Sequence, residues 1–403
     1  NIELFIPPRE FLGDLTRSAG VNEIIEWIEN IPECDAMVIS LDTIAYGGLI
    51  PSRRSTDSLE DIKSRLKRLK PSLKNKKVYA FSSIMRISNN NYNEEEKEYW
   101  KDWGKKIFEY SYSGVNDGIP QAILDDYLAT RKRNFEINKT YLNWGLNTLI
   151  FSKDDCAPKG FNVDEARELE RLGAKTKTGA DEIPLTLLAR AIEKEIKVFV
   201  EFTEPDYKDC ISNYEDVSIE KSVQGQLELG GFTQVQTREE ADVILIVNNF
   251  IEKQGEYVMG WTTQPFRKTF TPPDKPYAIA DVRYANGADN DFVEQLLPQI
   301  DLKNFYGYAG WNTSANTGSL LAGVKVRWNA GKYNEAAFKR LQIIRFLDDW
   351  AYQANVRGMI ENPCDIQDLM KPYEIKLAEI FGQIPPIEYL YPWSRKFEVE
   401  ISI

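Results

Sequence analysis

The sequence contains no histidine among its 403 residues. This absence excludes Ser-His-Asp and Cys-His nucleophilic catalysis, HExxH zinc chemistry and imidazole ligation of a metal ion. Any proton transfer must therefore be carried out by Asp, Glu, Tyr, Lys or Cys side chains. Carboxylates are plentiful, because the chain has 62 Asp and Glu residues against 50 Lys and Arg residues.

Cysteine is also scarce. The four cysteines, Cys34, Cys156, Cys210 and Cys364, are far apart and show neither a CxxC pair nor the spacing of a secreted disulfide scaffold. Reduced thiols and no zinc site are the expected state. No signal-peptide pattern opens the chain, and we therefore expect a cytoplasmic protein.

The chain lacks long apolar runs, basic clusters and nucleotide-binding motifs. No apolar run approaches the roughly 18 residues that span a bilayer, and a net charge of −12 disfavours nucleic acid and anionic membranes as partners. The basic run over residues 63–77 is typical of a solvated helix face. No G-x-G-x-x-G opens a helix after a strand and no Walker A sequence occurs, so no cofactor is expected.

Short β-rich runs alternate with longer amphipathic runs, which is the pattern of β/α units on a parallel sheet. Many of the short runs are almost continuously apolar, as expected for strands covered on both faces. Strands are predicted over residues 3–6, 36–40, 77–82, 148–152, 174–178, 197–202, 242–247, 277–281, 305–310 and 396–403. Helices are predicted over residues 21–30, 59–69, 94–110, 120–147, 164–172, 185–195 and 373–381, with a long helical region over 320–357.

Residues 197–275 form a strand, helix, short strand and strand of their own, which is typical of a small flavodoxin-like layer. We predict that this segment is an inserted α/β domain. Residues 1–196 are then the first part of a main β/α domain, and residues 276–403 are its remainder with C-terminal helices and a strand. Polar and Gly-rich segments follow the strands of the main domain, at the edge where barrels and open α/β sheets bind ligands.

Six ordered motifs together resemble the bacterial domain-of-unknown-function 4127 family: "SLDTIAYGGLIPSR", "YAFSSIMRIS", "ILDDYLATRKRN", "DDCAPKG", "TGADEIPLTLLAR" and "GYAGWNTSANT". Members usually begin with a strand ending in a Pro-Leu-Asp-Asp-Arg-Pro-like segment, which is missing here. If a first β/α unit is restored, the main-domain strands number eight. This count predicts a TIM-like barrel, incomplete at its N-terminus and interrupted by the inserted domain. The alternative is a two-lobed, doubly wound α/β protein.

Asp181 and Glu182 follow a predicted strand and precede an apolar helix. The pair is consistent with a helix start, because Asp is a favoured N-cap and Glu in the first turn complements the helix dipole. The segment is also similar to the Gly-Gly-Asp-Glu motif of barrel-fold β-N-acetylhexosaminidases. That resemblance implies that Asp181 orients the 2-acetamido group of the substrate and that Glu182 is the general acid.

Other candidate site residues also follow strands. Adjacent carboxylates such as Asp154 and Asp155 can bind a metal ion, hold sugar hydroxyls or split into an acid and a base, or they can cap a turn and form a local ion pair. The arginines near the strand ends can clamp an anionic ligand or pair with surface carboxylates. The remaining candidates supply polar groups and one aromatic face suited to a sugar ring, or are turn and core residues. The predicted substrate-binding residues are Asp42, Tyr46, Arg53, Arg86, Asp154, Asp155, Asp281, Asn286, Trp311 and Asn312.

We therefore predict a glycoside hydrolase that acts on a glycan containing amino sugars, by substrate-assisted catalysis with Asp181 and Glu182. Its partner is a small carbohydrate substrate, and no bound metal is required. Two alternatives stay open. One is a metal-dependent hydrolase or lyase that uses Asp42, Asp154 and Asp155, and the other is a non-catalytic protein that binds a sugar or metabolite.

Overall fold

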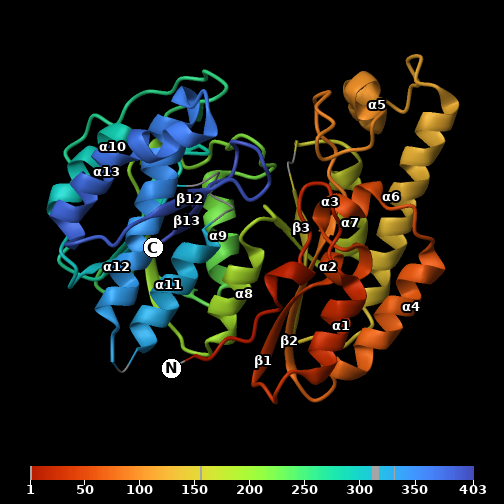
Figure 1. Cartoon of the computed structure of the whole chain (residues 1–403), viewed down its shortest axis with the longest axis horizontal. Coiled ribbons are helices and arrows are strands. Elements are labelled where there is room, and N and C mark those ends of the chain that lie inside the picture. Colours follow the sequence, from red (N-terminus) through yellow and green to blue (C-terminus); the bar gives the residue numbers. More distant parts are fainter. Residues whose placement is uncertain (1, 155–156, 311–316, 331) are drawn as a thin grey trace. The chain divides into compact units, whose positions relative to one another are not determined.

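The computed structural model describes residues 2–154, 157–310, 317–330 and 332–403 (Figure 1). The chain divides into two compact units, each with its own parallel sheet. The first unit consists of Asn1–Leu187 and Tyr214–Asp216, and the second of Leu188–Asn213 and Val217–Ile403. The α/β class predicted from the sequence is confirmed.

The first unit contains a 4-stranded parallel sheet in the order β1-β2-β3-β4, which is also the order along the chain. Ala36 of β1 pairs with Lys77 of β2, and Ile150 of β3 pairs with Lys175 of β4. Its elements are η1 (Arg9–Phe11), α1 (Val21–Asn30), β1 (Ala36–Ser40), α2 (Leu41–Tyr46), α3 (Leu49–Arg54), α4 (Leu59–Leu69), η2 (Lys70–Leu73), β2 (Lys77–Ile84), α5 (Trp100–Ser113), α6 (Gln121–Tyr141), β3 (Thr148–Lys153), α7 (Phe161–Arg171), β4 (Lys175–Thr178) and α8 (Ile183–Ala191), whose end lies in the second unit.

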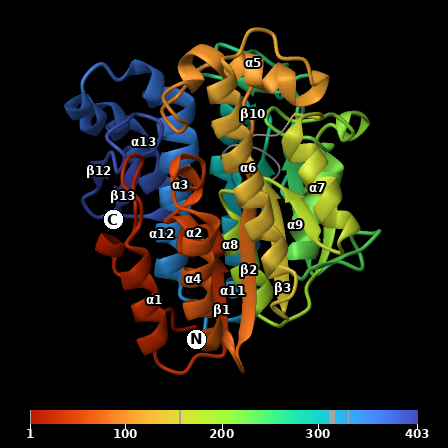
Figure 2. The ribbon, with the colours of Figure 1, turned by 90° about the vertical axis from the view of Figure 1, so that its right-hand side faces the viewer.

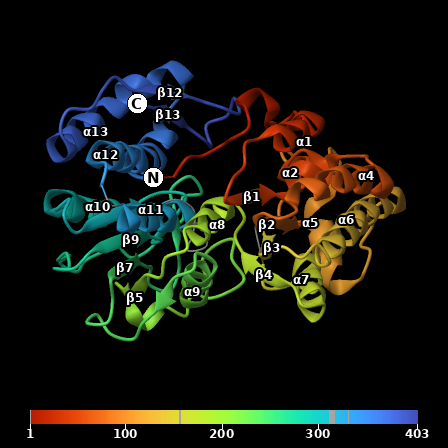
Figure 3. The same cartoon turned by 90° about the horizontal axis from the view of Figure 1, so that it is seen from below.

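Helices α1, α4, α6 and α7 of the first unit cover one face of its sheet (Figures 2 and 3). Right-handed crossovers between strands that follow one another in the same direction place every connection on the same side. The resulting core joins Ile25 of α1, Leu66 of α4 and Ile137 of α6 to the sheet residues Val78 and Phe151. Because the helices stay on this side, the loops at the carboxyl ends of the strands are left to carry polar groups.

The second unit contains a 5-stranded parallel sheet in the order β11-β9-β7-β5-β6. Its elements are β5 (Lys197–Phe202), η3 (Pro205–Tyr207), α9 (Ile219–Leu229), β6 (Thr233–Gln234), β7 (Val243–Asn248), β8 (Gly255–Glu256), β9 (Tyr277–Asp281), β10 (Tyr284–Ala285), α10 (Asn290–Leu296), η4 (Leu297–Gln299), β11 (Phe305–Ala309), α11 (Gly318–Asn329), α12 (Glu335–Arg345), the π-helix η5 (Phe346–Val356), η6 (Arg357–Met359), η7 (Pro363–Asp365), α13 (Ile366–Phe381), β12 (Glu388–Leu390) and β13 (Glu400–Ser402).

Both faces of the second sheet are covered by helices. One hydrophobic cluster joins α9 and α11 to the sheet through residues such as Val223, Leu321 and Leu245. Another joins α10, η5 and α13 to it through residues such as Phe292 and Ile279. Counted along the chain, the strand order is 2-1-3-4-5, which is the doubly wound, flavodoxin-like order. The chain reverses direction across the sheet between β5 and β7, and ligands bind at such a switch point in open α/β sheets.

The predicted strand over residues 3–6 is wrong, because the chain there is irregular and the side chains of Ile2, Leu4 and Ile6 are exposed. Pro7 and Pro8 follow this apolar run, and proline has no N–H to donate to a neighbouring strand. The sheet of the second unit also crosses the boundary predicted between residues 275 and 276, since β7 pairs with β9. In the described part of the chain, no helix combines the length and apolar character needed to cross a membrane.

Candidate functional site

Asp42 lies at the carboxyl end of β1, where the chain passes directly from the strand into α2. The Ser40 hydroxyl caps this helix by accepting the Thr43 N–H at 3.3 Å. The Asp42 carboxylate accepts the Ser83 backbone N–H at 2.7 Å and lies 3.0 Å from the Ser82 hydroxyl. Asp42 is only 3% exposed, and burial raises its pKa to about 6.

Burial favours the protonated form of Asp42, whereas the hydrogen bonds from Ser83 and Ser82 oppose this shift. Asn138 donates from Nδ2 to the Ser83 carbonyl at 3.1 Å, so its Oδ1, 2.8 Å from the Ser82 hydroxyl, is an acceptor. The Ser82 hydroxyl has one hydrogen, so it can donate to Asp42 or to Asn138 but not to both at once. When it donates to Asn138, a proton on Asp42 can complete the contact between Asp42 and Ser82. Asp42 is therefore a group that can hold or release a proton near neutral pH.

Tyr46 ends α2 one turn after Asp42. It lines a cavity of about 690 Å³ together with residues such as Arg54 and Asp57. Its hydroxyl is buried and has no hydrogen-bond partner among the described residues, and the Arg133 guanidinium lies 5.4 Å from the ring centre. Burial, followed by the charge of Asp42, raises the pKa of Tyr46 above its usual range. Tyr46 is thus a neutral phenol within this polar region.

Arg53 and Arg86 form an ion cluster with Glu95, Glu96 and Asp154. Arg53 Nη1 lies 3.2 Å and Arg86 Nε 2.9 Å from Glu96 Oε1, and Arg86 Nη2 lies 3.0 Å from Glu95 Oε2. Asp154 Oδ2 lies 3.8 Å from Arg53 Nη1 and 3.6 Å from Arg86 Nη1. Both guanidinium groups therefore already neutralise carboxylates of this chain, and an anionic ligand would have to compete with them.

Asp181 and Glu182 lie after β4, on the same sheet edge as Asp154. The Gly179 N–H donates to the Lys153 carbonyl at 2.8 Å, which ties the two strand ends together. The Glu182 carbonyl accepts the Leu185 N–H at 3.1 Å, so Glu182 occupies the N-cap position of α8 and Asp181 precedes it. The Asp181 side chain is exposed, whereas Glu182 is only 8% exposed.

A buried lysine lies on β4 beside this pair. Burial lowers the pKa of Lys177 to about 7, with Glu215 opposing the shift and Lys153 adding to it. Its ammonium group donates to the Thr178 carbonyl at 2.8 Å. Lys153 and the Thr178 hydroxyl both contact the Asp216 carboxylate. This edge therefore holds two amines and several carboxylates, which can exchange protons without histidine.

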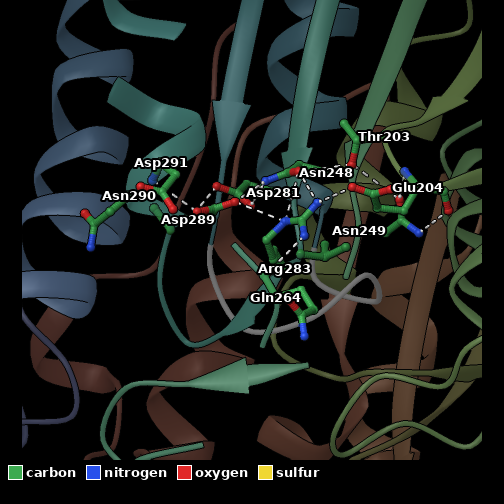
Figure 4. Close-up of polar contacts among 12 residues, drawn as sticks. Thr203, Glu204, Asn248, Asn249, Gln264, Asp281, Arg283, Asp289, Asn290 and Asp291 are labelled. Carbon is green, nitrogen blue, oxygen red and sulfur yellow. Dashed lines mark hydrogen bonds and ion pairs between the residues drawn. The ribbon is translucent and has the colours of Figure 1, made fainter. Parts of the chain in front are cut away.

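A separate polar network lies at the carboxyl edge of the second unit (Figure 4). Asp281 ends β9 and accepts hydrogen bonds from Asn248 Nδ2 at 2.9 Å, the Asp289 N–H at 2.8 Å and the Tyr308 hydroxyl at 2.8 Å. Asn248 Nδ2 also lies 3.2 Å from Asp289 Oδ2. Burial and the neighbouring Asp289 carboxylate raise the pKa of Asp281, and two carboxylates this close favour sharing one proton.

Arg283 lies between two carboxylates in the same network (Figure 4). Its Nε is 3.0 Å from Asp289 Oδ2 and its Nη2 is 3.1 Å from Glu204 Oε1. Its third nitrogen, Nη1, donates to the Gln264 carbonyl at 2.9 Å. The Arg283 side chain is fully buried. Glu204 follows β5 and Asn248 ends β7, and these two strands flank the switch point.

The π-helix η5 contributes another carboxylate to this edge. Asp349 accepts the Gly310 N–H at 2.6 Å directly after β11, and it pairs with Arg345 at 2.6 Å. Burial raises the pKa of Asp349. Asn286 precedes Asp289 by three residues, and its backbone adopts the left-handed conformation with φ of 52°. Its side-chain amide donates to the Glu256 carboxylate at 2.9 Å. π-Helical turns are uncommon and occur frequently at functional sites.

The family model described as "Protein of unknown function (DUF4127)" matches residues 1–402. The chain belongs to this family. The resemblance inferred from the six motifs is thereby confirmed. No curated protein and no solved structure matches the chain significantly.

In this member of the DUF4127 family, the predicted site residues fall into groups by unit. Arg53, Arg86 and Asp154 meet in one ion cluster of the first unit. The other predicted residues of that unit, which follow β1 or β4, are Asp42, Tyr46, Asp181 and Glu182. Asp281 and Asn286 lie in the second unit, whereas Asp155, Trp311 and Asn312 lie outside the described residues.

Several residues of these clusters were not predicted from the DUF4127 motifs. They are Glu95, Glu96, Lys177, Glu204, Arg283, Tyr308 and Asp349. Arg283 follows β9 within the same polar segment as Asp281, so its position after a strand was a usable signal. Among the described residues, no group of three or more Cys, Asp or Glu side chains is arranged to hold a metal ion.

Proposed function

We propose that this DUF4127 protein is a hydrolase of glycosidic bonds in a small carbohydrate that contains an amino sugar. The observation that carries the proposal is the position of Glu182 and Asp181. A buried and an exposed carboxyl group stand side by side directly after β4, on the edge that also holds Asp42 and Asp154. This pairing suits a reaction in which one carboxyl group is shielded from water and the other meets substrate.

In the proposed reaction, Glu182 donates its proton to the glycosidic oxygen as the bond from C1 to that oxygen breaks. The carbonyl oxygen of the substrate's 2-acetamido group attacks C1, and Asp181 orients this group and stabilises its developing positive charge. The Glu182 carboxylate then removes a proton from water, which opens the cyclic intermediate and restores the acid. The steps need neither histidine nor a nucleophile from the protein.

The other residues of the first unit supply binding groups in this proposal. Asp154 is held between Arg53 and Arg86, so its carboxylate is fixed in place while accepting hydroxyl hydrogen bonds. Asp42 and Tyr46 are further polar groups after β1. The two-lobed alternative for the architecture is favoured by the separate four-stranded and five-stranded sheets and by the flavodoxin-like order of the second. A cytoplasmic location is part of the proposal, consistent with the free thiols Cys34, Cys210 and Cys364.

The test is to incubate the purified protein with aryl N-acetylhexosaminides and other aryl glycosides, and to repeat the assay with Glu182→Gln. General acid catalysis contributes about 10²–10⁴ in rate, and a loss of that size is expected for aglycones that leave poorly. Glu60→Gln, an exposed change on α4, is the control and should leave the rate unchanged. Hydrolysis that is indifferent to Glu182→Gln refutes the assignment.

Asp181→Asn separates substrate assistance from other hydrolytic mechanisms. It should slow aryl N-acetylhexosaminides strongly while leaving the affinity for the same sugars largely intact. Metal analysis of protein purified without chelator addresses the metal-dependent alternative, which uses Asp42, Asp154 and Asp155. Sugar binding without turnover in wild-type protein would favour the non-catalytic alternative.

A further inference from the structure

The second unit contains a cavity of about 670 Å³ outside the buried network of Asp281 and Arg283. Its volume lies within the range of about 300–1,000 Å³ that is typical of small-molecule sites. The lining combines aromatic rings, side-chain amides and charged groups from the segment before β9, from α10, from η5 and from α13. We propose that this cavity binds an uncharged sugar unit.

The apolar part of the lining comes from Phe266, Trp350 and Tyr373. The Trp350 and Tyr373 rings meet edge to face, with their centroids 5.0 Å apart. The Trp350 Nε1–H donates to Asn290 Oδ1 at 2.9 Å, which fixes the indole in its plane. Trp350 and Phe266 are only 2% and 5% exposed, whereas Tyr373 is partly exposed. Tyr373, held against Trp350, is therefore the ring that can meet the C–H face of a sugar.

The polar part of the lining is arranged in advance by hydrogen bonds. Asn290 Oδ1 accepts from both Trp350 and Asn355, the latter at 2.9 Å. Asn355 Nδ2 also donates to the Trp350 carbonyl at 2.7 Å, so both of its amide hydrogens are used. Among the described residues, Asn355 Oδ1 has no donor, which leaves it able to accept a hydrogen bond from a ligand hydroxyl.

The buried network supports this wall through α10. Asp289 caps α10 by accepting the Asp291 N–H at 3.1 Å, and the Arg283 guanidinium holds the same Asp289 carboxylate (Figure 4). Asn290 and Asp291 in the first turn are therefore placed by a fully buried ion pair. The Asp291 carboxylate itself makes no hydrogen bond or ion pair with a described residue, and it is exposed at the cavity.

The charges of the lining indicate an uncharged ligand. Glu294 is paired with Lys376 at 2.8 Å, and the remaining charged side chains, Arg267 and Asp291, have opposite signs. A phosphorylated or carboxylated ligand would need an excess of positive charge that this lining lacks. Hydroxyl groups, in contrast, can donate to Asp291 and Asn355 and accept from Arg267.

This inference goes beyond the proposed hydrolysis, because binding here requires no bond cleavage and no residue of the first unit. The two can fail independently. Glu182→Gln and Asp181→Asn should alter turnover but not binding at this cavity, whereas changes at Tyr373 or Asp291 should alter binding there.

The experiment is calorimetry on the full chain with glucose, galactose, mannose, N-acetylglucosamine and their methyl glycosides. At least one of these sugars is expected to bind to wild-type protein. Tyr373→Ala should weaken that affinity by about tenfold, because a lost aromatic contact costs about 1–1.5 kcal/mol. Tyr373→Phe should retain the affinity, since the ring is kept.

Ile375→Ala is the matched control, because Ile375 lies on the same helix and is 57% exposed. If Tyr373→Ala does not fold, Asp291→Asn serves in its place and should weaken binding several-fold. Failure of every sugar to bind overturns the proposal. So does binding that only Asp181→Asn weakens, or tighter binding of glucose 6-phosphate than of glucose.

Discussion

At the residue scale, the unusual feature of this protein is how many carboxyl groups are buried near the carboxyl ends of its strands. Asp42, Asp281, Asp289 and Asp349 are each less than a tenth exposed, and burial raises the pKa of all four. Each is nevertheless supplied with hydrogen-bond donors. Because a chain without histidine must use such groups to hold protons near neutral pH, these positions are where changes in pH should be felt.

Asp42 should make folding stability depend on pH between about 4 and 6. Its folded pKa of about 6 lies above the ordinary value of 3.8, so the stabilising contribution is fully present below 3.8 and is lost as pH rises through about 6. The expected loss is about 3 kcal/mol. Asp42→Asn should remove this dependence of stability on pH, because the amide does not titrate and can donate to the Ser82 hydroxyl and accept from Ser83.

Urea unfolding of wild type and Asp42→Asn across this pH range measures the effect. The free energy of unfolding of the variant, relative to wild type, should increase as the pH is raised. Asp35→Asn is the control, since Asp35 is an exposed carboxylate just before β1. A variant that loses stability relative to wild type as the pH is raised would show that Asp42 is held as an anion.

Glu204 offers a direct comparison of a buried and an exposed cation. It pairs with Arg283, whose side chain is fully buried, at 3.1 Å and with Lys268, whose side chain is 54% exposed, at 2.7 Å. Arg283→Leu should destabilise the protein by about 3–5 kcal/mol, because it leaves Asp289 buried without a cation and Glu204 with Lys268 alone. Lys268→Leu should cost no more than about 1 kcal/mol. Equal losses in urea unfolding would contradict this account.

At the element scale, much of the fold was predictable because its signals are local. The apolar run of β7 and the amphipathic pattern of α1 and α4 placed these elements correctly, with α1 and α4 matching to the residue. The run over residues 3–6 failed because the same local signal has no strand partner in the described structure. Whether an apolar run pairs with another strand depends on the tertiary structure, which the run itself does not determine.

The candidate sites divide in the same way. Residues directly after strands, such as Asp42 and Asp154, were predictable because parallel strands bring their carboxyl ends to one edge. Glu95 and Glu96 were not, because they lie in the long segment between β2 and α5 and reach Arg53 across 42 and 43 positions of sequence. Motifs indicate which side chains reach an edge, whereas the ion partners depend on how loops fold over it.

The turn that ends α2 is expected to be more sensitive than the turn that ends α5. Gly47 and Gly114 both terminate their helices in the left-handed region, with φ of 86° and 67°. A Cβ at Gly47 would lie 2.8 Å from the Ser18 Cβ, whereas a Cβ at Gly114 would meet nothing within 4 Å. Gly114→Ala should cost about 1 kcal/mol from backbone strain alone, and Gly47→Ala about 3 kcal/mol from strain and overlap.

Denaturant midpoints of the two alanine variants test this difference. The m-values should match that of wild type, because neither change alters the surface exposed on unfolding. Equal destabilisation would mean that the Ser18 segment moves aside without cost, so that Gly47 is required only for its backbone conformation.

At the scale of the whole molecule, two sheets with different strand orders imply two folding units. The first sheet keeps the chain order, whereas the second follows the flavodoxin-like order. Each unit has hydrophobic clusters of its own, with Leu66 in a cluster of the first unit and Ile279 in a cluster of the second. A unit with its own core can unfold as a cooperative block.

Leu66→Ala and Ile279→Ala should therefore act on different blocks. Each removes a buried aliphatic side chain and should destabilise its unit by about 2–5 kcal/mol. Hydrogen exchange followed by mass spectrometry should show lost protection over β1–β3 for Leu66→Ala, and over β7 and β9 for Ile279→Ala. If either change lowered protection equally across both sheets, the 403 residues would unfold as one cooperative system. A sugar bound in the second unit would then raise the free energy of unfolding of both units by the same amount.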